Sequence, residues 1–409
     1  MAAESLVKVA ERHNPKRAFV LVSTVLGKHM PVTAPRCRLA GLALGLAVAG
    51  DPRAERARLA VLEGTTSVAL DLVDEIEGAP VGTVPHADEA RGSERVAGAE
   101  PYLVIGFAET ATALGEQVAT ALDAVFWQTT TRQASIAASG IPFDEPHSHA
   151  PVQWIAEPLD GWPDGTMVLV DDELTTGATA CNLIEVIHGV SPRPQYVIAA
   201  ILDGRAADGA GLIERLAERL GVTIDVVSLA TRDPEQHTVA GWSGGALPQQ
   251  AESVPPSAEA DIRDLFLEFD GALQHDGQDR EARLALAEAA LVAAAEVGPL
   301  APRSLVLGTG EHLAFAQRAS MPAAALVSST TRSPVLVSNR AEYPIRDGLA
   351  FANPDDLAVP GFAYNVHPAD RPSIVVHFQD GDHRERGQAL LDALVAAGAR
   401  DLTAVTLAP

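Results

Sequence analysis

Short apolar runs alternate along the chain with segments of helical periodicity. The apolar run at residues 18–23 predicts a buried strand that leads into a polar loop, and residues 38–48 predict a helix. The order strand, turn, helix occurs at residues 101–122, 166–188 and 196–221. This alternation predicts an α/β fold with a parallel sheet and helices on its faces.

Periodicity is lost between residues 232 and 261, where Pro, Gly, Ser and Gln accumulate and indicate a linker or a wrapping arm. Strands and helices then resume to the end of the chain. We therefore expect a first domain over residues 1–235, a linker over 236–262, and a second α/β domain over 263–409. No internal repeat is evident in the sequence.

Composition restricts the class of protein. The 409 residues are 47% hydrophobic and 21% charged, which is typical of a globular chain. The formal net charge of -24 argues against nucleic acid as a partner, because binding to phosphates requires a basic surface.

No apolar run is long enough to span a membrane, and the charged N-terminus lacks the apolar segment of a signal peptide. Cys37 and Cys181 have neither the number nor the spacing of a disulfide framework or a metal site. We expect a soluble protein of the cytoplasm.

The segment with the most chemical information is VLVDDELTTGATA, residues 168–180. Its apolar strand ends in Asp171 and Asp172, which suit the two hydroxyls of a ribose diol. The turn that follows carries threonine hydroxyls and a glycine before a helix begins, an arrangement suited to a phosphate monoester. The alternative is an ordinary strand-to-helix turn whose aspartates cap the helix without any ligand.

This segment resembles the signature of the type I phosphoribosyltransferases. The resemblance implies that Asp171 and Asp172 bind the ribose hydroxyls of phosphoribosyl pyrophosphate and approach its magnesium indirectly, through ligand or water. It implies that the 5'-phosphate is held by Thr175, Thr176, Gly177, Ala178 and Thr179. Glu173 stands where that family usually has an apolar residue.

The family also has a strand followed by a tight loop that holds pyrophosphate. LVIGFAETATALG, residues 103–115, occupies that place, and the loop would be Gly106, Phe107, Ala108, Glu109 and Thr110. Glu109 would repel pyrophosphate unless a metal ion intervenes. The alternative is a simple helix N-terminus that an acidic residue stabilises.

A third family element is a mobile hood over the reacting centre, which we assign to residues 127–151. Arg132 could stabilise the departing pyrophosphate, and His147 or His149 could transfer a proton. Surface histidines on a polar loop are an equally good explanation. Near the N-terminus, Lys28 and His29 follow a strand and are candidates to contact substrate, with a solvated loop as the alternative.

More narrowly, the chain is similar to a branch of these transferases associated with tellurium-resistance gene clusters. NPKRAFVLVS, GKHMPV, FDEPHSHAP and TTRSPV carry this similarity, and the last contains the Thr-Arg-Ser-Pro motif that names the C-terminal TRSP domain of the branch. In that domain we expect Arg332 to form an anion site with the turn at residues 308–311; the alternative is a structural arginine bonded to protein acceptors.

The resemblance implies a magnesium-dependent transfer of ribose 5-phosphate from phosphoribosyl pyrophosphate to a small base-like acceptor, in the synthesis of a nucleoside-like metabolite. A homodimer is compatible with this reading. Two rivals stay open: a protein that senses the sugar phosphate without turning it over, and an enzyme whose main chemistry lies in the C-terminal domain.

Overall fold

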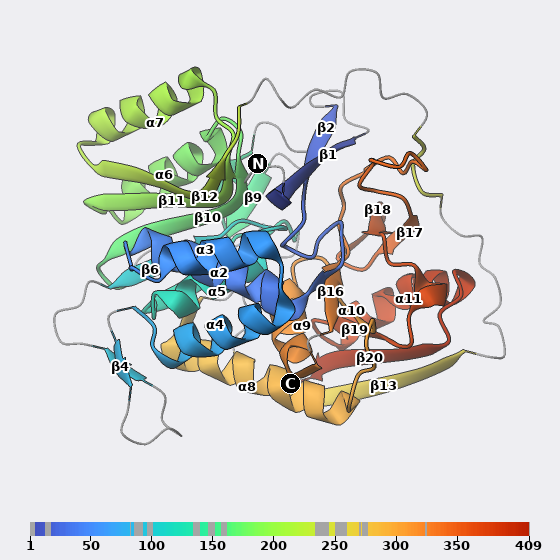
Figure 1. Ribbon diagram of the computed structural model, residues 1–409. Helices are drawn as coiled ribbons and strands as arrows, with labels where there is room; N and C mark the ends of the chain where they lie inside the picture. The colour runs from blue at the N-terminus through green and yellow to red at the C-terminus, as the bar shows by residue number, and fades with distance from the viewer. Residues whose placement is uncertain are drawn as a thin grey trace. The chain divides into compact units, whose positions relative to one another are not determined.

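The computed structural model describes residues 5–12, 18–81, 83–85, 93–95, 101–133, 140–145, 152–156, 162–233, 245–249, 260–269, 271, 277–323 and 325–408. The chain forms two compact units (Figure 1). Unit 1 consists of Met1–Leu6, Pro35–Gln236 and Ala272–Leu284, and unit 2 consists of Val7–Ala34, His237–Gly271 and Ala285–Pro409. The two long helices α2 and α8 each begin in one unit and continue in the other.

Unit 1 contains a six-stranded sheet, two short hairpins and six helices among its described residues. In chain order its elements are α2 (Ala34–Val48), α3 (Ala54–Glu63), α4 (Thr66–Gly78), β4 (Thr83–Pro85), β5 (Ser93–Arg95), β6 (Tyr102–Gly106), α5 (Thr112–Ala121), β7 (Phe126–Thr129), β8 (Ile141–Asp144), β9 (Val152–Ile155), β10 (Thr166–Leu174), α6 (Ala178–Val190), β11 (Gln195–Asp203), α7 (Ala207–Leu220), β12 (Thr223–Thr231) and β14 (Gln278–Asp279).

The strand order of this sheet is β12-β11-β10-β6-β7-β14. Its first five strands are parallel, and only the edge strand β14 is antiparallel. The first five residues of β10 are buried, as expected of a strand covered on both faces. The predicted α/β fold with a parallel sheet is therefore confirmed.

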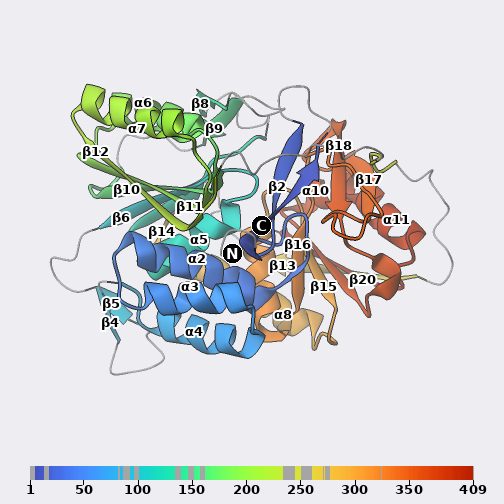
Figure 2. The same cartoon turned by 45° about the horizontal axis from the view of Figure 1, so that its top comes forward.

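Helices cover both faces of the unit 1 sheet. Figure 2 shows α6 and α7 on one face and α2 and α5 on the other. Helix α5 approaches β6 closely because glycines stand at the contact: a Cβ at Gly115 would lie 2.8 Å from the Gly106 Cα.

Unit 2 contains a second six-stranded sheet. Its elements in chain order are β1 (Val7–Glu11), β2 (Phe19–Ser23), β3 (Val32–Thr33), β13 (Asp261–Glu268), α8 (Arg280–Val297), β15 (Leu305–Gly308), α9 (Leu313–Ser320), a 3-10 turn (Met321–Ala323), β16 (Leu326–Ser329), β17 (Gly348–Asn353), β18 (Asp356–Tyr364), a 3-10 turn (Pro368–Asp370), β19 (Ile374–Phe378), α10 (Gly381–Arg386), α11 (Gln388–Ala396) and β20 (Asp401–Ala408).

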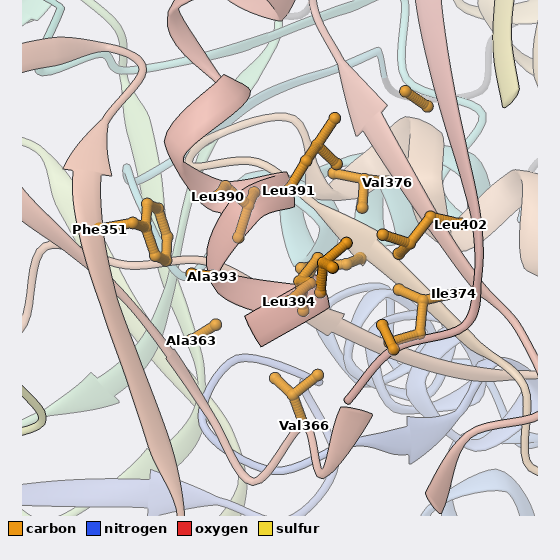
Figure 3. Close-up of a cluster of buried hydrophobic side chains, with 14 of the residues drawn as sticks. Phe351, Ala363, Val366, Ile374, Val376, Leu390, Leu391, Ala393, Leu394 and Leu402 are labelled. Atoms are coloured by element: carbon orange, nitrogen blue, oxygen red, sulfur yellow. The ribbon is translucent and has the colours of Figure 1, made fainter. Parts of the chain in front are cut away.

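The main core of unit 2 lies between its sheet and helix α11. Figure 3 shows Ile374 and Val376 of β19 and Leu402 of β20 facing Leu390 and Leu394 of the helix. All five side chains are almost completely excluded from water. Burial of each apolar side chain stabilises the fold by about 1.5–3 kcal/mol.

The N-terminal segment 7–34 packs with unit 2, although the sequence suggested one contiguous domain over residues 1–235. The reason is apolar contact: Ala10 and Val22 share a buried cluster with Val335 and Tyr364, and β3 pairs with β16. Most of the predicted linker over residues 236–262 lies outside the described residues.

The two units repeat one topology, which the sequence analysis did not detect. The unit 2 sheet has the order β13-β20-β19-β15-β16-β3, again with five parallel strands and one antiparallel edge strand. In both units the chain passes from a central strand through a helix to the next strand, and then through a hairpin to the strand on the other side of the central one. In unit 1 these elements are β6, α5, β7, β8–β9 and β10. In unit 2 they are β15, α9, β16, β17–β18 and β19. The two outer strands differ in chain order: β12 and β14 follow their sheet neighbours in the chain, whereas β13 and β3 precede theirs.

Among the helices of the described ranges, none combines the length and apolar character that a membrane crossing requires.

Candidate active site

Three segments of unit 1 meet at the carboxyl edge of its parallel strands. Gly106, the last residue of β6, lies in register with Val170 of β10 on one side and with Thr129 of β7 on the other. The residues that follow these three strands are therefore neighbours. In open parallel sheets this edge is where ligands bind.

Asp171 and Asp172 continue β10 beyond the buried part of the strand. The Asp171 carboxylate accepts a hydrogen bond from the Asp172 amide at 2.9 Å, and the Asp172 carboxylate accepts one from the Glu173 amide at 3.1 Å. Burial, followed by the negative charges of Asp172 and Glu145, raises the pKa of Asp171 well above its ordinary value. Asp171 therefore lies in strongly acidic surroundings.

The threonine-rich turn leads from β10 into α6 by way of Gly177. Gly177 precedes the first residue of the helix and has a φ of 78°, in the left-handed region that favours glycine. The Thr176 hydroxyl accepts a hydrogen bond from the Ala178 amide at 3.3 Å. The turn therefore has the local structure that the sequence predicted.

Arg205 adds a positive charge beside this turn that sequence analysis missed. It follows β11, and its guanidinium forms two hydrogen bonds with Asp203 at 2.8 and 2.9 Å. Asp203 lies in register with Leu174, directly before the turn. The Arg205 Cδ is 3.7 Å from where a Cβ would stand at Gly177.

The turn after β6 is fixed by bonds to both neighbouring strands. The Phe107 amide donates to the Val170 carbonyl at 2.9 Å, and the Ala108 amide donates to the Thr130 hydroxyl at 2.8 Å. The peptide bond between Ala108 and Glu109 is cis. Two amides expected to hold pyrophosphate, those of Phe107 and Ala108, thus have protein partners.

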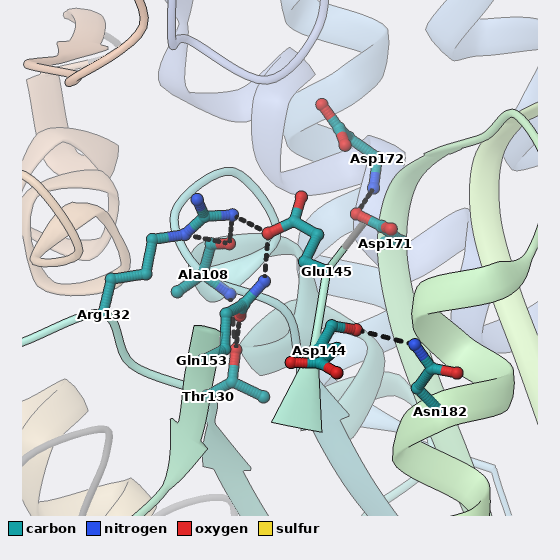
Figure 4. A network of polar contacts seen from close by, with 9 residues as sticks. All are labelled: Ala108, Thr130, Arg132, Asp144, Glu145, Gln153, Asp171, Asp172 and Asn182. Carbon is teal, nitrogen blue, oxygen red and sulfur yellow. Dashed lines mark hydrogen bonds and ion pairs between the residues drawn. The ribbon is translucent and has the colours of Figure 1, made fainter. Parts of the chain in front are cut away.

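Arg132 lies against this turn, as Figure 4 shows. Its guanidinium donates to the Ala108 carbonyl at 3.0 and 3.2 Å and pairs with the Glu145 carboxylate at 2.5 Å. Glu145 also accepts a hydrogen bond from Gln153 at 2.6 Å, and Gln153 accepts one from Thr130 at 2.5 Å. Sequence analysis missed Glu145 and Gln153.

The predicted hood begins too early in the sequence. Its first residues form β7 inside the sheet, where Trp127 is completely buried, so a segment that opens and closes cannot include them. The hairpin β8–β9 lies within and just after the predicted hood, and Asn182 of α6 donates to the Asp144 carbonyl at 2.9 Å. His147 and His149 lie outside the described residues.

The remaining candidates, Lys28, His29 and Arg332, belong to unit 2. His29 is buried against Tyr364, with ring centroids 5.7 Å apart, and burial lowers its pKa well below the ordinary value. The Lys28 carbonyl accepts a hydrogen bond from Ser328 at 3.3 Å. Arg332 pairs with Asp355 at 3.6 Å.

Comparison with known families agrees with the arrangement in unit 1. The family described as phosphoribosyl transferase matches residues 6–233, and the TRSP domain that occurs C-terminal to this transferase matches residues 271–394. The first match covers more than half of the chain. The chain belongs to the phosphoribosyltransferase family and is an enzyme of this class.

Several solved structures of phosphoribosyltransferases show similarity to the chain. The adenine phosphoribosyltransferase of Rhodothermus marinus is 12% identical, over 56% of this chain and 98% of its own, with a TM-score of 0.29. The Giardia lamblia enzyme is 14% identical, over 56% and 97%, with a TM-score of 0.29. The orotate phosphoribosyltransferase of Aeropyrum pernix is 26% identical, over 43% and 76%, with a TM-score of 0.22. No curated protein matches the chain.

Proposed function

We propose that the enzyme transfers ribose 5-phosphate from phosphoribosyl pyrophosphate to a small base-like acceptor and releases pyrophosphate. One observation carries this proposal: the acidic pair Asp171–Asp172 lies near the carboxyl end of a central parallel strand, which ends at Leu174 and leads through the Gly177 turn into α6. A diol-binding pair and a phosphate-binding turn thus lie on one contiguous segment. The product would be a nucleotide from which a nucleoside-like metabolite is made.

The sugar phosphate would bind with its 5'-phosphate in the turn of residues 175–179. Backbone amides at the start of a helix and threonine hydroxyls are the donors that a phosphate monoester accepts. Arg205 stands beside Gly177 and would add charge. The carboxylates of Asp171 and Asp172 would accept hydrogen bonds from the ribose hydroxyls.

The pyrophosphate would bind at the turn after β6. Arg132 is the cation of this turn and is held there by the Ala108 carbonyl and by Glu145. Because an arginine binds a phosphate oxygen and a carboxylate with similar geometry, pyrophosphate would take the place of Glu145 on the guanidinium. Arg132 would then neutralise the charge that develops on the leaving group.

The carboxylates of this edge suit magnesium, which prefers oxygen ligands and keeps several waters. Burial, and after it the negative charges of Asp172 and Glu145, raise the pKa of Asp171, and a divalent cation would offset the repulsion between these charges. Within the described ranges no group of three acidic, histidine or cysteine side chains is assembled to hold a metal by itself. This fits a magnesium ion that arrives with the substrate, where it would neutralise pyrophosphate oxygens.

During transfer the bond between the anomeric carbon and pyrophosphate breaks as the acceptor nitrogen bonds to that carbon. Positive charge develops on the ribose, as it does in glycoside cleavage. Asp171 and Asp172 lie at the strand end that would face this charge and would stabilise it electrostatically.

The test measures pyrophosphate release from phosphoribosyl pyrophosphate and Mg²⁺ against a panel of purine, pyrimidine and related heterocyclic acceptors. We expect release to depend on one class of acceptor and to slow by about 100-fold when Asp171 and Asp172 are both changed to asparagine. Tight binding of phosphoribosyl pyrophosphate without release for any acceptor would instead identify a sensor.

A further inference from the structure

The repeated topology extends to individual hydrogen bonds at the carboxyl edge of both sheets. In unit 1 the Ala108 amide donates to the Thr130 hydroxyl at 2.8 Å. In unit 2 the Gly310 amide donates to the Thr330 hydroxyl at 2.7 Å. Each donor lies two residues after the glycine that ends its strand, and each acceptor directly follows the neighbouring strand.

The residue after each of these threonines repeats the same pairing with the hairpin. Thr131 exchanges two backbone hydrogen bonds with Trp154 of β9, at 2.9 and 3.0 Å. Thr331 exchanges two with Phe362 of β18, at 2.9 and 2.8 Å. Both hairpins are therefore attached to their sheets at the same point.

The third residue is an arginine in both units, and its partner is a carboxylate from the connection between the hairpin strands. Arg132 pairs with Glu145, which directly follows β8, at 2.5 Å. Arg332 pairs with Asp355, which directly precedes β18, at 3.6 Å. The sequence Thr-Thr-Arg thus occupies one structural position twice.

Asp355 lies over the turn after β15 beside two basic side chains, His383 and Arg332. His383 accepts a hydrogen bond at Nδ1 from the Gln379 amide at 3.2 Å, which leaves the proton on Nε2, 3.1 Å from Asp355. Burial raises the pKa of Asp355, but its interactions with His383 and then Arg332 outweigh burial and lower it. An ionised carboxylate therefore lies against Gly310, where a Cβ would be only 2.4 Å from its oxygen.

Unit 2 lacks the part of the site that would recognise ribose 5-phosphate. His377 is in register with Gly308, as Val170 is with Gly106, so Phe378 stands at the position of Asp171. Phe378 is buried in the apolar core. The acid that follows, Asp380, caps helix α10 by accepting the His383 amide at 2.7 Å.

We propose that unit 2 carries a second anion site, formed by the turn of residues 309–312 and Arg332, which binds a diphosphate group without its sugar. Unit 2 retains a turn and an arginine that correspond to the proposed pyrophosphate contacts of unit 1. It lacks the contacts that would hold the ribose diol and the phosphate monoester. The assignment of diphosphate as the ligand rests on the proposed role of the turn beside Arg132. The structural repeat of the two units does not depend on that role. In the absence of ligand the Asp355 carboxylate pairs with the Arg332 guanidinium, and the diphosphate displaces this carboxylate.

The experiment is calorimetric titration of the full chain with inorganic pyrophosphate and Mg²⁺. We expect two molecules to bind per chain in the wild type and one to bind after Arg132→Gln. Arg332→Gln should weaken the remaining site about 10- to 100-fold, the factor that a charge-assisted hydrogen bond contributes. Arg340→Gln, which removes the same charge from an exposed residue of unit 2, should change nothing.

A variant that is expected to strengthen pyrophosphate binding distinguishes a ligand site from a structural ion pair. Asp355→Asn removes the competing carboxylate and should tighten pyrophosphate binding severalfold, whereas a structural pair would give no change. Parallel titration with a nucleoside diphosphate distinguishes free pyrophosphate from a nucleotide as the natural source.

Several outcomes would overturn the proposal. Loss of all pyrophosphate binding in Arg132→Gln would do so, even if neither unit 2 variant folds. Unchanged affinity in both Arg332→Gln and Asp355→Asn would do so as well. Failure of the proposed transfer reaction would instead appear as absent pyrophosphate release, with binding that still depends on Arg332.

Discussion

The side chain of Arg205 extends over Gly177, so that its Cδ lies 3.7 Å from the position of a Cβ at that glycine. A residue that follows β11 thereby lies beside the turn that follows β10. Ile213 of α7 closes the same space, with its Cδ1 3.1 Å from that Cβ position. The turn is thus bounded on this side by one cation and one apolar side chain.

We expect Gly177→Ala to weaken binding of phosphoribosyl pyrophosphate and to destabilise unit 1. Its φ of 78° costs an L-residue about 1–2 kcal/mol, and the new methyl group would press on Ile213. Gly189→Ala is the matched control, because Gly189 lies in α6 with nothing near its Cβ position. Calorimetry and thermal unfolding test the pair. Equal donor affinity in both variants would contradict the assignment of the turn.

Arg205→Gln should weaken binding of ribose 5-phosphate about tenfold or more while leaving pyrophosphate affinity unchanged. The reason is that Arg205 stands beside the monoester turn, and a charged hydrogen bond contributes about 1.5–3 kcal/mol. Arg219→Gln is the control, since Arg219 is an exposed arginine of α7 paired with Glu185. Titrations with the two ligands test this prediction. A comparable loss of affinity for both ligands would show that Arg205 does not bind the 5'-phosphate specifically.

Local pattern was sufficient to predict the strand, turn and helix at the centre of the candidate site. The buried run before Asp171 and the glycine before α6 are neighbours in sequence, so the strand, turn and helix could be read from one short segment. The strand and loop at Gly106 were found for the same reason. Such features depend on periodicity and turn chemistry, which act over a few residues.

Contacts between distant segments could not be predicted in this way. Glu145 reaches Arg132, and Gln153 reaches Glu145, only because the hairpin β8–β9 folds back to bond with Thr131. Arg205 reaches the turn through strand register. The segment 7–34 joins unit 2 through apolar contacts of β1 and β2 and through β3, a strand of two residues with no pattern of its own.

The internal repeat was missed because little sequence similarity accompanies it. The shared triplet Thr-Thr-Arg occurs at residues 130–132 and 330–332, but the segments between Gly106 and Thr130 and between Gly308 and Thr330 differ in length. The acids that hold the two arginines also differ in type. The outer strand β13 stands before its sheet partners in the chain, which hides the correspondence further.

Changing Asp171 and Asp172 together to asparagine should lower turnover by about 100-fold while weakening donor binding much less. Neutral amides still form hydrogen bonds with a diol, but they cannot stabilise positive charge that develops on the ribose. Single-turnover kinetics beside equilibrium titration separate the two effects. Proportional losses in affinity and rate would mean that the carboxylates act in binding alone.

The raised pKa of Asp171 makes the stability of unit 1 depend on pH. Because the folded state holds this proton more tightly than the unfolded state, stability decreases as pH rises from the ordinary aspartate range to the raised pKa of Asp171.

Asp171→Asn removes the penalty of ionising a buried carboxyl beside Asp172 and Glu145. Single stabilising substitutions commonly contribute about 0.5–2 kcal/mol, so Tm at neutral pH should rise by ~1–8 °C. Thermal unfolding across pH 4–8 tests this expectation against Asp225→Asn, which alters an exposed strand residue of the same sheet. A wild type and a D171N variant with parallel pH profiles would show that the carboxylate cluster imposes no such cost.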